Sequence, residues 1–371
     1  MIAENDINFC EPLACGDDYP KPQFSPLPNV AGASNAKSRS VPLGTTTVLH
    51  SARARYAWAS IAKAELTPQD TVLLPAYHCP AMVEPIVWAG CKIAFYRLRK
   101  DLSPEPDDLA RLLPQAKAIV LVRFFGFEGH IQSLCEMARE QGCLVIEDLA
   151  HTAFAQTLHG DYGVTSLPKF YAVDYGSEIF IRAGHDETRL RTYIEKTQRN
   201  PLLWNSTRLL KQVQNRVQAV SAAGTGKLQG KFRYFCAEDM SRPFNRKASL
   251  QIMRSDHEDI VQKRRSNFLR LQNIFEQSGL GHGLYTDLDS NFIPYMYPFV
   301  LHDAEFFHSI RTAGVPLFRW EELAPTNCRV SQEYHKTLIQ VPCHQDVTGA
   351  DIDLIESTIL TGARARVGGT I

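Results

Sequence analysis

Short apolar segments alternate with amphipathic ones between residues 45 and 185. The apolar segments have the length and composition of buried strands, and the segments between them repeat with a helical period. This alternation predicts βαβ units and a mainly parallel sheet covered by helices on both faces. Ligands bind such sheets where the strands end. The expected elements are a helix at 53–66, a strand at 71–74, a helix at 80–89, a strand at 92–98, a helix at 105–113, a strand at 117–124, a helix at 130–141 and a strand at 143–148.

The pattern changes after residue 186 toward longer helices and fewer strands. One long amphipathic helix is predicted at 247–278, where Gly279 supplies its C-cap. The other expected elements are a helix at 201–221, a strand at 292–300, a helix at 303–313, a strand at 338–342 and a helix at 350–361. We therefore predict an irregular N-terminal arm at 1–44, a large α/β domain at 45–240 and a smaller C-terminal α+β domain at 241–371.

Composition narrows the class of protein. The 371 residues carry 40 Lys plus Arg and 40 Asp plus Glu, so no global positive field favours DNA or RNA, and no nucleic-acid partner is expected. The nine cysteines form no CxxC motif, which indicates a reducing, cytoplasmic setting and no metal site. The first residues, MIAENDINFCEP, lack a signal-peptide core, and no apolar stretch is long enough to span a membrane.

Three local features could carry chemistry. Asp148 ends the strand CLVIED, and His151 follows three residues later; a helix N-cap and a packed histidine are the simpler interpretations. Ser166 precedes Lys169 in a weak S-x-x-K motif, in which a desolvated lysine amine would be free to attack an aldehyde. Ser51, Ala52 and Arg53 begin the first helix, where backbone amides either bind a phosphate or receive an ordinary cap.

These features are more informative together than alone. Pyridoxal 5'-phosphate needs a phosphate site, an acid beside its pyridinium nitrogen and a lysine for its aldehyde. The chain offers a helix start at Arg53, an acid at Asp148 and a lysine 21 residues later at Lys169. The combination therefore predicts pyridoxal 5'-phosphate as the cofactor.

The sequence resembles the DegT-like sugar aminotransferases, a family of fold type I pyridoxal-phosphate enzymes. The resemblance runs from about Leu49 to the C-terminus and is carried by DTVLLPAYHCPAMVEPIVWAG, KAIVLVRFFGF, VIEDLAH, LFRWEEL and LIQVPCHQ. Family members carry Gly-Gly seven residues after the lysine. Here Gly176 stands at that position, and Ser177 replaces the second glycine. Ala52 also replaces a common glycine, and the segment between Asp148 and Lys169 is short for the family.

The resemblance implies roles residue by residue. Lys169 would be the Schiff-base lysine and Asp148 the partner of the pyridinium nitrogen. His151 would lie near the phenolic oxygen of the cofactor, and Tyr77 or His78 would cover its face. The residues implied to hold the phosphate are Ser51, Ala52, Arg53 and Ser166.

The activity implied by the resemblance is transfer of an amino group from glutamate or glutamine to a nucleotide-linked keto-sugar, by a homodimer. A substrate of negative charge also fits the ten basic residues between Thr188 and Cys236, which only Glu195 opposes. A solvated helix face is the simpler interpretation of that run. Two other functions remain open: a lyase or dehydratase that uses the same cofactor and fold, and a non-catalytic regulator that binds the cofactor.

Overall fold

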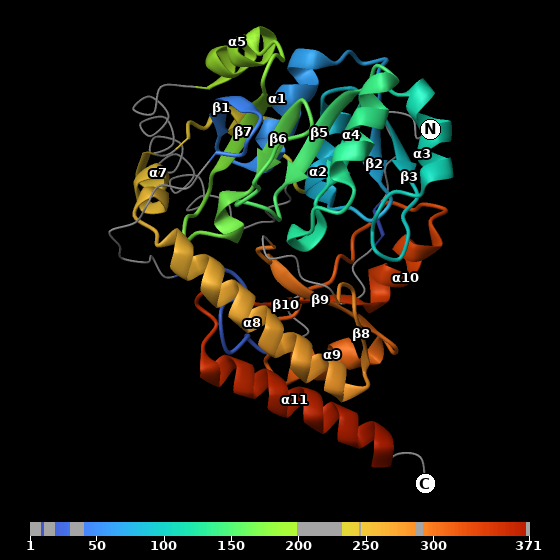
Figure 1. Cartoon of the computed structure of the whole chain (residues 1–371), viewed down its shortest axis with the longest axis vertical. Coiled ribbons are helices and arrows are strands. Elements are labelled where there is room, and N and C mark those ends of the chain that lie inside the picture. Colours follow the sequence, from blue (N-terminus) through green and yellow to red (C-terminus); the bar gives the residue numbers. More distant parts are fainter. Residues whose placement is uncertain are drawn as a thin grey trace, which may run out of the picture.

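Two β-sheets organise the chain in the computed structural model (Figure 1). The structure describes residues 9–10, 19–29, 41–198, 232–244, 246–286 and 292–368. A seven-stranded sheet lies in the N-terminal half, and a three-stranded sheet lies in the C-terminal half. Among the helices of these described ranges, none is long and apolar enough to cross a bilayer.

The large sheet has the strand order β1-β7-β6-β5-β4-β2-β3. Five neighbouring strands, from β6 through β5, β4 and β2 to β3, pair in parallel, whereas β7 pairs antiparallel with both β6 and β1. The fold is thus α/β with a mainly parallel mixed sheet, as predicted. The strands are β1 (Thr45–Ser51), β2 (Thr71–Pro75), β3 (Lys92–Tyr96), β4 (Ala118–Val122), β5 (Leu144–Leu149), β6 (Tyr162–Thr165) and β7 (Ser177–Arg182).

Helices cover both faces of this sheet because alternate side chains of its strands are apolar on both sides. On one face, Val72, Val120 and Ile146 pack against three helices: α1 (Ala54–Glu65), α2 (Pro80–Trp88) and α5 (Thr188–Thr197). On the other face, Leu73 and Val145 pack against α3 (Pro106–Leu112) and α4 (Ile131–Glu140). Turns η2 (Leu113–Gln115) and η3 (Phe124–Gly126) flank β4, and η4 (Leu167–Lys169) follows β6.

The C-terminal sheet has the order β10-β9-β8 and is antiparallel throughout. Its strands are β8 (Gly281–Gly283), β9 (Met296–Leu301) and β10 (Leu338–Pro342). Three helices pack on one face: α8 (His257–Ser278), α9 (Glu305–Thr312) and α11 (Gly349–Gly368). The remaining elements there are η5 (Ala237–Ser241), α7 (Arg246–Met253) and α10 (Arg329–Thr337).

One hydrophobic cluster joins the two sheets. Leu73 and Leu121 of the large sheet share it with Ile260 of α8, Val300 of β9 and Leu338 of β10. The two halves therefore bury apolar surface against each other, and the large sheet receives part of its cover from the C-terminal half.

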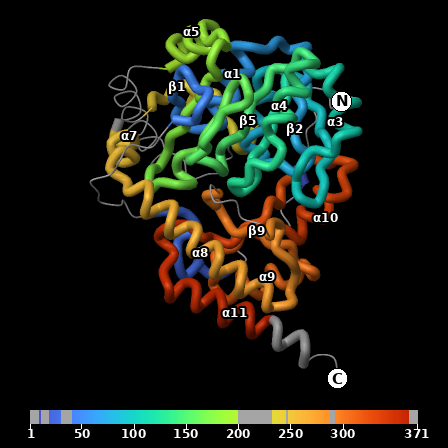
Figure 2. The backbone as a smooth tube through the Cα atoms, in the orientation of Figure 1, coloured from blue at the N-terminus to red at the C-terminus, as the bar shows by residue number. Residues whose placement is uncertain are grey.

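The described part of the N-terminal arm packs on the C-terminal half. The Gln23 amide donates to the Gly314 carbonyl (2.9 Å), and His344 Nε2 donates to the Ser25 carbonyl (2.9 Å). Figure 2 shows this segment, residues 19–29, beside the elements of the C-terminal half. No helix or strand occurs within the described stretches of residues 9–29, and the irregular arm at 1–44 stays a prediction.

Several predicted elements need correction. The helix predicted at 247–278 is two helices, α7 and α8, because Asp256 accepts a hydrogen bond from the Asp259 amide (3.0 Å) and thereby starts a new helix. The strand predicted at 292–300 begins only at Met296. The C-cap at Gly279 is confirmed by its left-handed backbone, and the helix predicted at 201–221 lies outside the described residues.

Candidate active site

A cavity of about 170 Å³ opens where β5 and β6 end and where α1 and α2 begin. Helix α1 contributes Arg53, at its N-cap, and Arg55, while Asp148 comes from β5 and Lys169 from η4. This is the edge at which ligands are expected in a parallel sheet. The other lining residues are Ala54, Trp58, Cys79, Ala81, Met82, Ala150, Ser166, Pro168 and Gly176.

Asp148 and Lys169 are the central pair of opposite charges in this cavity. Asp148 is buried, and its Oδ1 accepts a hydrogen bond from the Ala150 amide (2.8 Å). Burial raises the pKa of Asp148, and the Lys169 charge and that hydrogen bond oppose the rise. Burial likewise lowers the pKa of the Lys169 amine, against the pull of Asp148 and Cys79. Burial therefore disfavours the charged form of each group, and the opposite charge of the other group favours it.

His151 is held in one neutral form next to this pair. Its Nδ1 accepts a hydrogen bond from the Phe125 amide (3.1 Å), so the ring proton must sit on Nε2. Burial, with the Lys169 charge second, holds the pKa of His151 well below its usual range. At neutral pH this imidazole can donate a hydrogen bond from Nε2 but does not carry a charge.

The start of α1 brings two arginine side chains to the cavity. Arg53 is the N-cap of α1 and makes no side-chain hydrogen bond to the first turn, and its side chain lines the cavity together with that of Arg55. Two guanidinium groups and the first amides of a twelve-residue helix favour a phosphate. Ser166 lines the same cavity, and its contact with a phosphate stays a prediction.

Five of the predicted residues do not line the cavity, namely Ser51, Ala52, Tyr77, His78 and His151. The Ser51 hydroxyl donates to the Arg53 carbonyl (3.2 Å), and Ala52 is buried against Tyr56. Tyr77 is buried and stacks on the Trp320 ring at 4.7 Å. Neither residue of the pair Tyr77 and His78 faces Lys169, whereas the next residue, Cys79, does line the cavity. That one of these two rings covers a cofactor stays a prediction.

His78 has a different environment from the one that the sequence suggested. Its Nδ1 donates to the carbonyls of Pro75 (3.1 Å) and Ala76 (3.0 Å), and its Nε2 accepts from the Ala324 amide (2.9 Å). Burial lowers its pKa to about 4. Both ring nitrogens are therefore used in joining the end of β2 to the C-terminal half.

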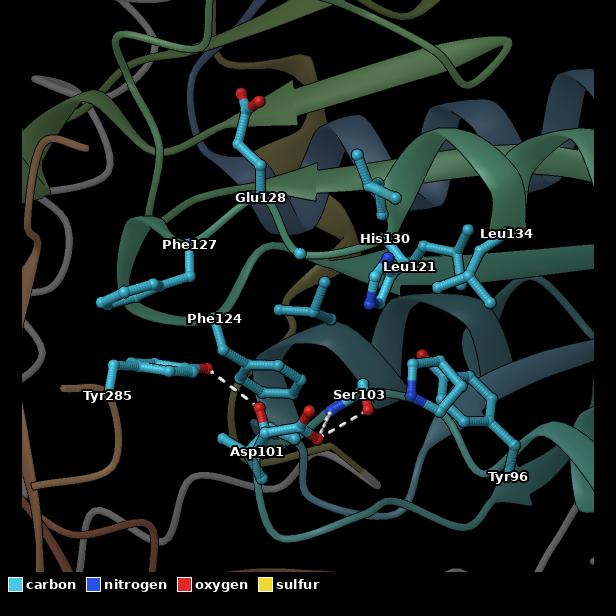
Figure 3. Close-up of a pocket in the computed structure, with 15 residues that line it drawn as sticks. Tyr96, Asp101, Ser103, Leu121, Phe124, Phe127, Glu128, His130, Leu134 and Tyr285 are labelled. Carbon is cyan, nitrogen blue, oxygen red and sulfur yellow. Dashed lines mark hydrogen bonds between the residues drawn. The ribbon is translucent and has the colours of Figure 1, made fainter. Parts of the chain in front are cut away.

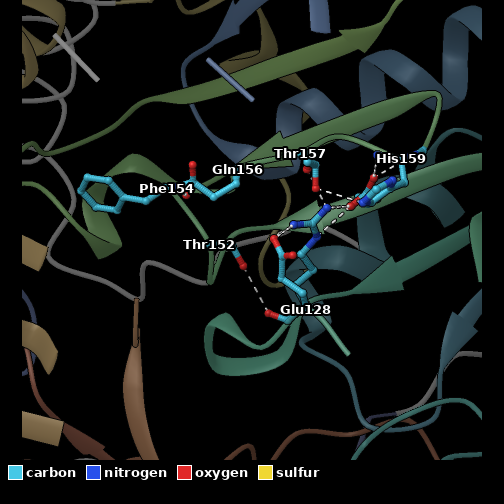
Figure 4. A network of polar contacts seen from close by, with 9 residues as sticks. Glu128, Thr152, Phe154, Gln156, Thr157 and His159 are labelled. Carbon is cyan, nitrogen blue, oxygen red and sulfur yellow. Dashed lines mark hydrogen bonds and ion pairs between the residues drawn. The ribbon is translucent and has the colours of Figure 1, made fainter. Parts of the chain in front are cut away.

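Glu147 and Asp148 are neighbours on β5 but face opposite sides of the sheet. Glu147 is fully buried and accepts from Nε (2.8 Å) and Nη2 (2.5 Å) of Arg123, and from the amides of His159 and Gly160 (Figure 4). Arg123 also donates to Glu128 and to the Thr157 carbonyl. This network satisfies the Glu147 charge completely, so its role is to fix the end of β5.

A second cavity, of about 230 Å³, lies on that opposite side of the sheet (Figure 3). Its walls include Tyr96, Phe124 and Tyr285. It is also lined by Asp101 and Ser103, and the Ser103 hydroxyl donates a hydrogen bond to Asp101 Oδ1 (2.6 Å). It is larger than the first cavity, but no lysine or arginine lines it. Of these two cavities, the one with Lys169 is the one that offers cationic partners to an anionic group.

Sequence reasoning missed Arg55, Cys79, Trp58 and Tyr295 as residues of this site. Arg55 and Trp58 could have been found, because they follow Arg53 on the first two turns of the same helix. The Tyr295 ring lies beneath the Lys169 amine, 4.9 Å from Nζ to the ring centroid. Nothing in the local sequence joins Tyr295 to Lys169, since 126 residues separate them.

The comparisons with known proteins agree with this geometry. Residues 51–173 match the model of the DegT/DnrJ/EryC1/StrS aminotransferase family. A curated protein of Saccharopolyspora spinosa, dTDP-4-dehydro-2,3,6-trideoxy-D-glucose 4-aminotransferase, is 34% identical over 98 residues, which are 26% of this chain and 25% of that protein. The match therefore spans about a quarter of the length of this relative.

Solved structures resemble the chain over most of its length. PseC of Helicobacter pylori, an aminotransferase involved in the biosynthesis of pseudoaminic acid, has a TM-score of 0.65 at 14% identity and covers 87% of this chain and 88% of its own. NtdA of Bacillus subtilis, solved with bound cofactor PMP, has a TM-score of 0.64 at 14% identity, over 86% of this chain and 74% of its own. At such identities the likeness establishes the fold.

Proposed function

Residues 51–173 are a DegT/DnrJ/EryC1/StrS aminotransferase family domain, and from this premise we propose that the protein is a pyridoxal-phosphate-dependent aminotransferase acting on a nucleotide-linked keto-sugar. The observation that carries the proposal is the shared cavity of Lys169 and Asp148 beside the cationic start of α1. Family membership supports the reaction class, and the cavity supports the cofactor.

The residues of the cavity fit pyridoxal 5'-phosphate in chemistry and in charge. Arg53, Arg55 and the first turn of α1 suit its phosphate, and Ser166 adds a hydroxyl. The Lys169 amine suits its aldehyde, and the Asp148 carboxylate suits a protonated ring nitrogen. Gly176 lines the cavity at a tightly packed position, because a Cβ there would lie 3.0 Å from Leu167 and 3.1 Å from Phe244.

When bound, the cofactor supplies an electron sink for the electrons released as a substrate C–H bond breaks. The chain supplies the proton transfers. The lowered pKa of Lys169 gives it more neutral amine at neutral pH than an exposed lysine has, so it can take up a proton and return it. In its ionised form, which the Lys169 charge favours, Asp148 can hold a proton on a neighbouring ring nitrogen, while His151 offers only its Nε2 proton.

The substrate and the assembly are further parts of the proposal. The Saccharopolyspora spinosa relative is named for a dTDP-linked keto-deoxyhexose, which supports a nucleotide-linked keto-sugar here. We propose glutamate or glutamine as the amino donor, a homodimer as the assembly and the cytoplasm as the location. The free cysteines among the described residues are compatible with a reducing compartment.

Borohydride reduction followed by peptide mapping tests the proposal. We expect a yellow protein whose cofactor becomes fixed to the peptide that contains Lys169. We expect Lys169→Ala to bind the cofactor only reversibly and to form no 2-oxoglutarate from glutamate. Lys63 is the matched control, because its Nζ donates to the Ala89 carbonyl (2.9 Å) away from the cavity.

Each other outcome rejects part of the proposal. Labelling of Lys63, or of no lysine, removes Lys169 from its role. Labelling of Lys169 without formation of 2-oxo acid from any amino donor favours a lyase, a dehydratase or a non-catalytic binding protein over an aminotransferase.

A further inference from the structure

The Lys169 amine lies over the face of an aromatic ring from the C-terminal half of the chain. Its Nζ lies 4.9 Å from the centroid of Tyr295, a buried residue immediately before β9. Among the described residues Nζ makes this ring contact and no hydrogen bond or ion pair. The ring face carries partial negative charge, so it favours the protonated amine at that position.

Three contacts keep the Tyr295 ring in place. Its amide donates to the Phe125 carbonyl (3.0 Å), and its ring stacks on His151 with 4.5 Å between centroids and an interplanar angle of 18°. Its own carbonyl accepts from Nη1 of Arg264 (3.2 Å). The ring is therefore fixed relative to both sheets and does not depend on Lys169 for its orientation.

Arg264 joins Tyr295 and Lys169 through their backbones. Its side chain is fully buried on α8, and its Nη2 donates to the Lys169 carbonyl (2.9 Å). Its Nη1 donates to the carbonyls of Pro294 (3.0 Å) and Tyr295, and its Nε donates to Gln345 Oε1 (3.0 Å). One guanidinium thus sets the distance between the lysine backbone and the tyrosine backbone.

We propose that Tyr295, held by Arg264, is a positioning residue for the Lys169 amine: its ring fixes where Nζ lies and stabilises the protonated form. The inference rests on the proposed function in one respect, because that function is what gives the Lys169 amine its proton transfers. It also assigns part of the active site to residues beyond the matched family domain of 51–173.

Other charged and titratable groups also act on this amine. Asp148 of β5 favours its protonation, and the Cys79 thiol at the start of α2 acts in the same direction once ionised. Arg53 and Arg55 of α1 line the same cavity, and His151 is neutral. A substitution of Tyr295 changes none of these charges, and Tyr295→Phe also keeps the ring that stacks on His151.

The test measures the pKa of Lys169 in the full-length chain after removal of bound cofactor. Trace acetylation over a range of pH, with the Lys169 peptide quantified by mass spectrometry against exposed Lys100 and Lys336, gives that pKa. For Tyr295→Leu we expect the Lys169 pKa to fall by about one unit, the size of a cation–π contact. For Tyr295→Phe, which keeps the ring, we expect no shift.

Tyr285→Leu is the matched control, because Tyr285 lines the second cavity, which contains no lysine. An unchanged Lys169 pKa in Tyr295→Leu overturns the proposal, and so does an equal shift in Tyr295→Phe. A similar shift in Tyr285→Leu also overturns it, since that result means a general loosening of the fold.

A second measurement needs no destabilising variant. In the wild-type chain labelled with ¹³C-lysine, the ε-methylene protons of Lys169 should be displaced upfield by the ring current of Tyr295, with the signal assigned by Lys169→Arg. A resonance at the position of exposed lysines contradicts the proposal. Both measurements use cofactor-free protein, so they succeed or fail independently of whether the chain transfers amino groups.

Discussion

Adjacent carboxyl groups at the end of β5 have different tasks because their surroundings differ. Glu147 accepts hydrogen bonds from Arg123, His159 and Gly160, so both of its carboxylate oxygens already have partners within the protein. Asp148 accepts one amide hydrogen bond and faces Lys169 across a cavity. A buried ion pair such as Arg123–Glu147 adds little net stability, but removing one partner costs about 3–5 kcal/mol. The pair thus fixes the strand end, and Asp148 remains open to a ligand.

Buried neutral histidines should make the fold sensitive to acid. Burial lowers the pKa of both His78 and His344 to about 4. In the unfolded chain each takes up a proton near pH 6.5, so between about pH 6.5 and 4 the unfolded state binds more protons. The free energy of unfolding should therefore fall with falling pH, by up to about 1.4 kcal/mol per pH unit for each histidine.

Urea denaturation at pH 7, 6 and 5 measures this slope. His78→Asn, which cannot titrate, should reduce the slope, whereas the same change at the exposed His130 should leave it as it is. An equal slope in the wild type and in His78→Asn would show that His78 is already protonated in the folded state.

At the scale of elements, three strands of the large sheet escaped prediction. β7 pairs antiparallel with β1 and β6, and β6, which pairs in parallel with β5, has only four residues, Tyr162–Thr165. The apolar residues of β1, β6 and β7 are too few to give a period, and their pairing is fixed by register between distant segments. The other parallel strands, β2 to β5, were predictable, because each contains a run of apolar residues.

The turn η3 shows how an element far from Lys169 in sequence can affect it. Gly126 has φ +108°, and a Cβ there would lie 2.5 Å from the Ile293 carbonyl oxygen, two residues before Tyr295. Gly126→Ala should therefore displace the segment that carries Tyr295. We expect a loss of several kcal/mol in the free energy of unfolding, since both the backbone strain and the clash must be relieved.

Gly129→Ala is the matched control for this prediction. Gly129 also has a positive φ of +54°, but nothing lies within 4 Å of an added Cβ. Urea denaturation should show a loss of about 1–2 kcal/mol for Gly129→Ala, the cost of the left-handed backbone alone. Equal losses in the two variants would mean that the approach to Ile293 is not close in solution.

At the scale of the whole molecule, the two sheets share one hydrophobic cluster. Leu73, Phe124 and Leu167 pack with Ile260, Tyr295 and Val300 across the predicted domain boundary at residue 240. Separation of the two halves would expose this cluster to water, at roughly 25 cal/mol for each Å² of apolar surface. The two predicted domains should therefore not unfold independently.

Thermal unfolding of the full chain tests this expectation. We expect one calorimetric transition, coincident with the change in tryptophan fluorescence. The tryptophans that report include Trp58 and Trp88 before residue 240 and Trp320 after it. Two resolved transitions would establish that the halves are separate folding units, in spite of the shared cluster.

The sequence predicted the large-sheet side of the site much better than the rest. Asp148 lies near the end of β5, and Ser166 and Lys169 come shortly after β6, so all three line one cavity at the edge where these parallel strands end. Tyr295 and Arg264 could not be predicted, because only the packing of α8 and β9 against η4 brings them to Lys169. Tyr77 and His78 are adjacent in sequence to Cys79, which lines the cavity, but their own side chains are buried in the core. The direction of a side chain after a strand end depends on the turn that follows.

The hydrogen bonds of Arg264 determine how the contact between Lys169 and Tyr295 responds to pH and salt. Arg264 donates to three backbone carbonyls and one side-chain amide, and all four acceptors are neutral oxygens. Burial lowers the pKa of Arg264 to about 10, so the side chain stays charged below that pH. Such a cation is solvated mainly by dipoles and forms no salt bridge with the described residues, although the Asp346 charge also favours its charged form. Neither acid nor added salt removes its partners. Acid should therefore weaken the protein first at its buried histidines, while the spacing between Lys169 and Tyr295 holds until the chain unfolds.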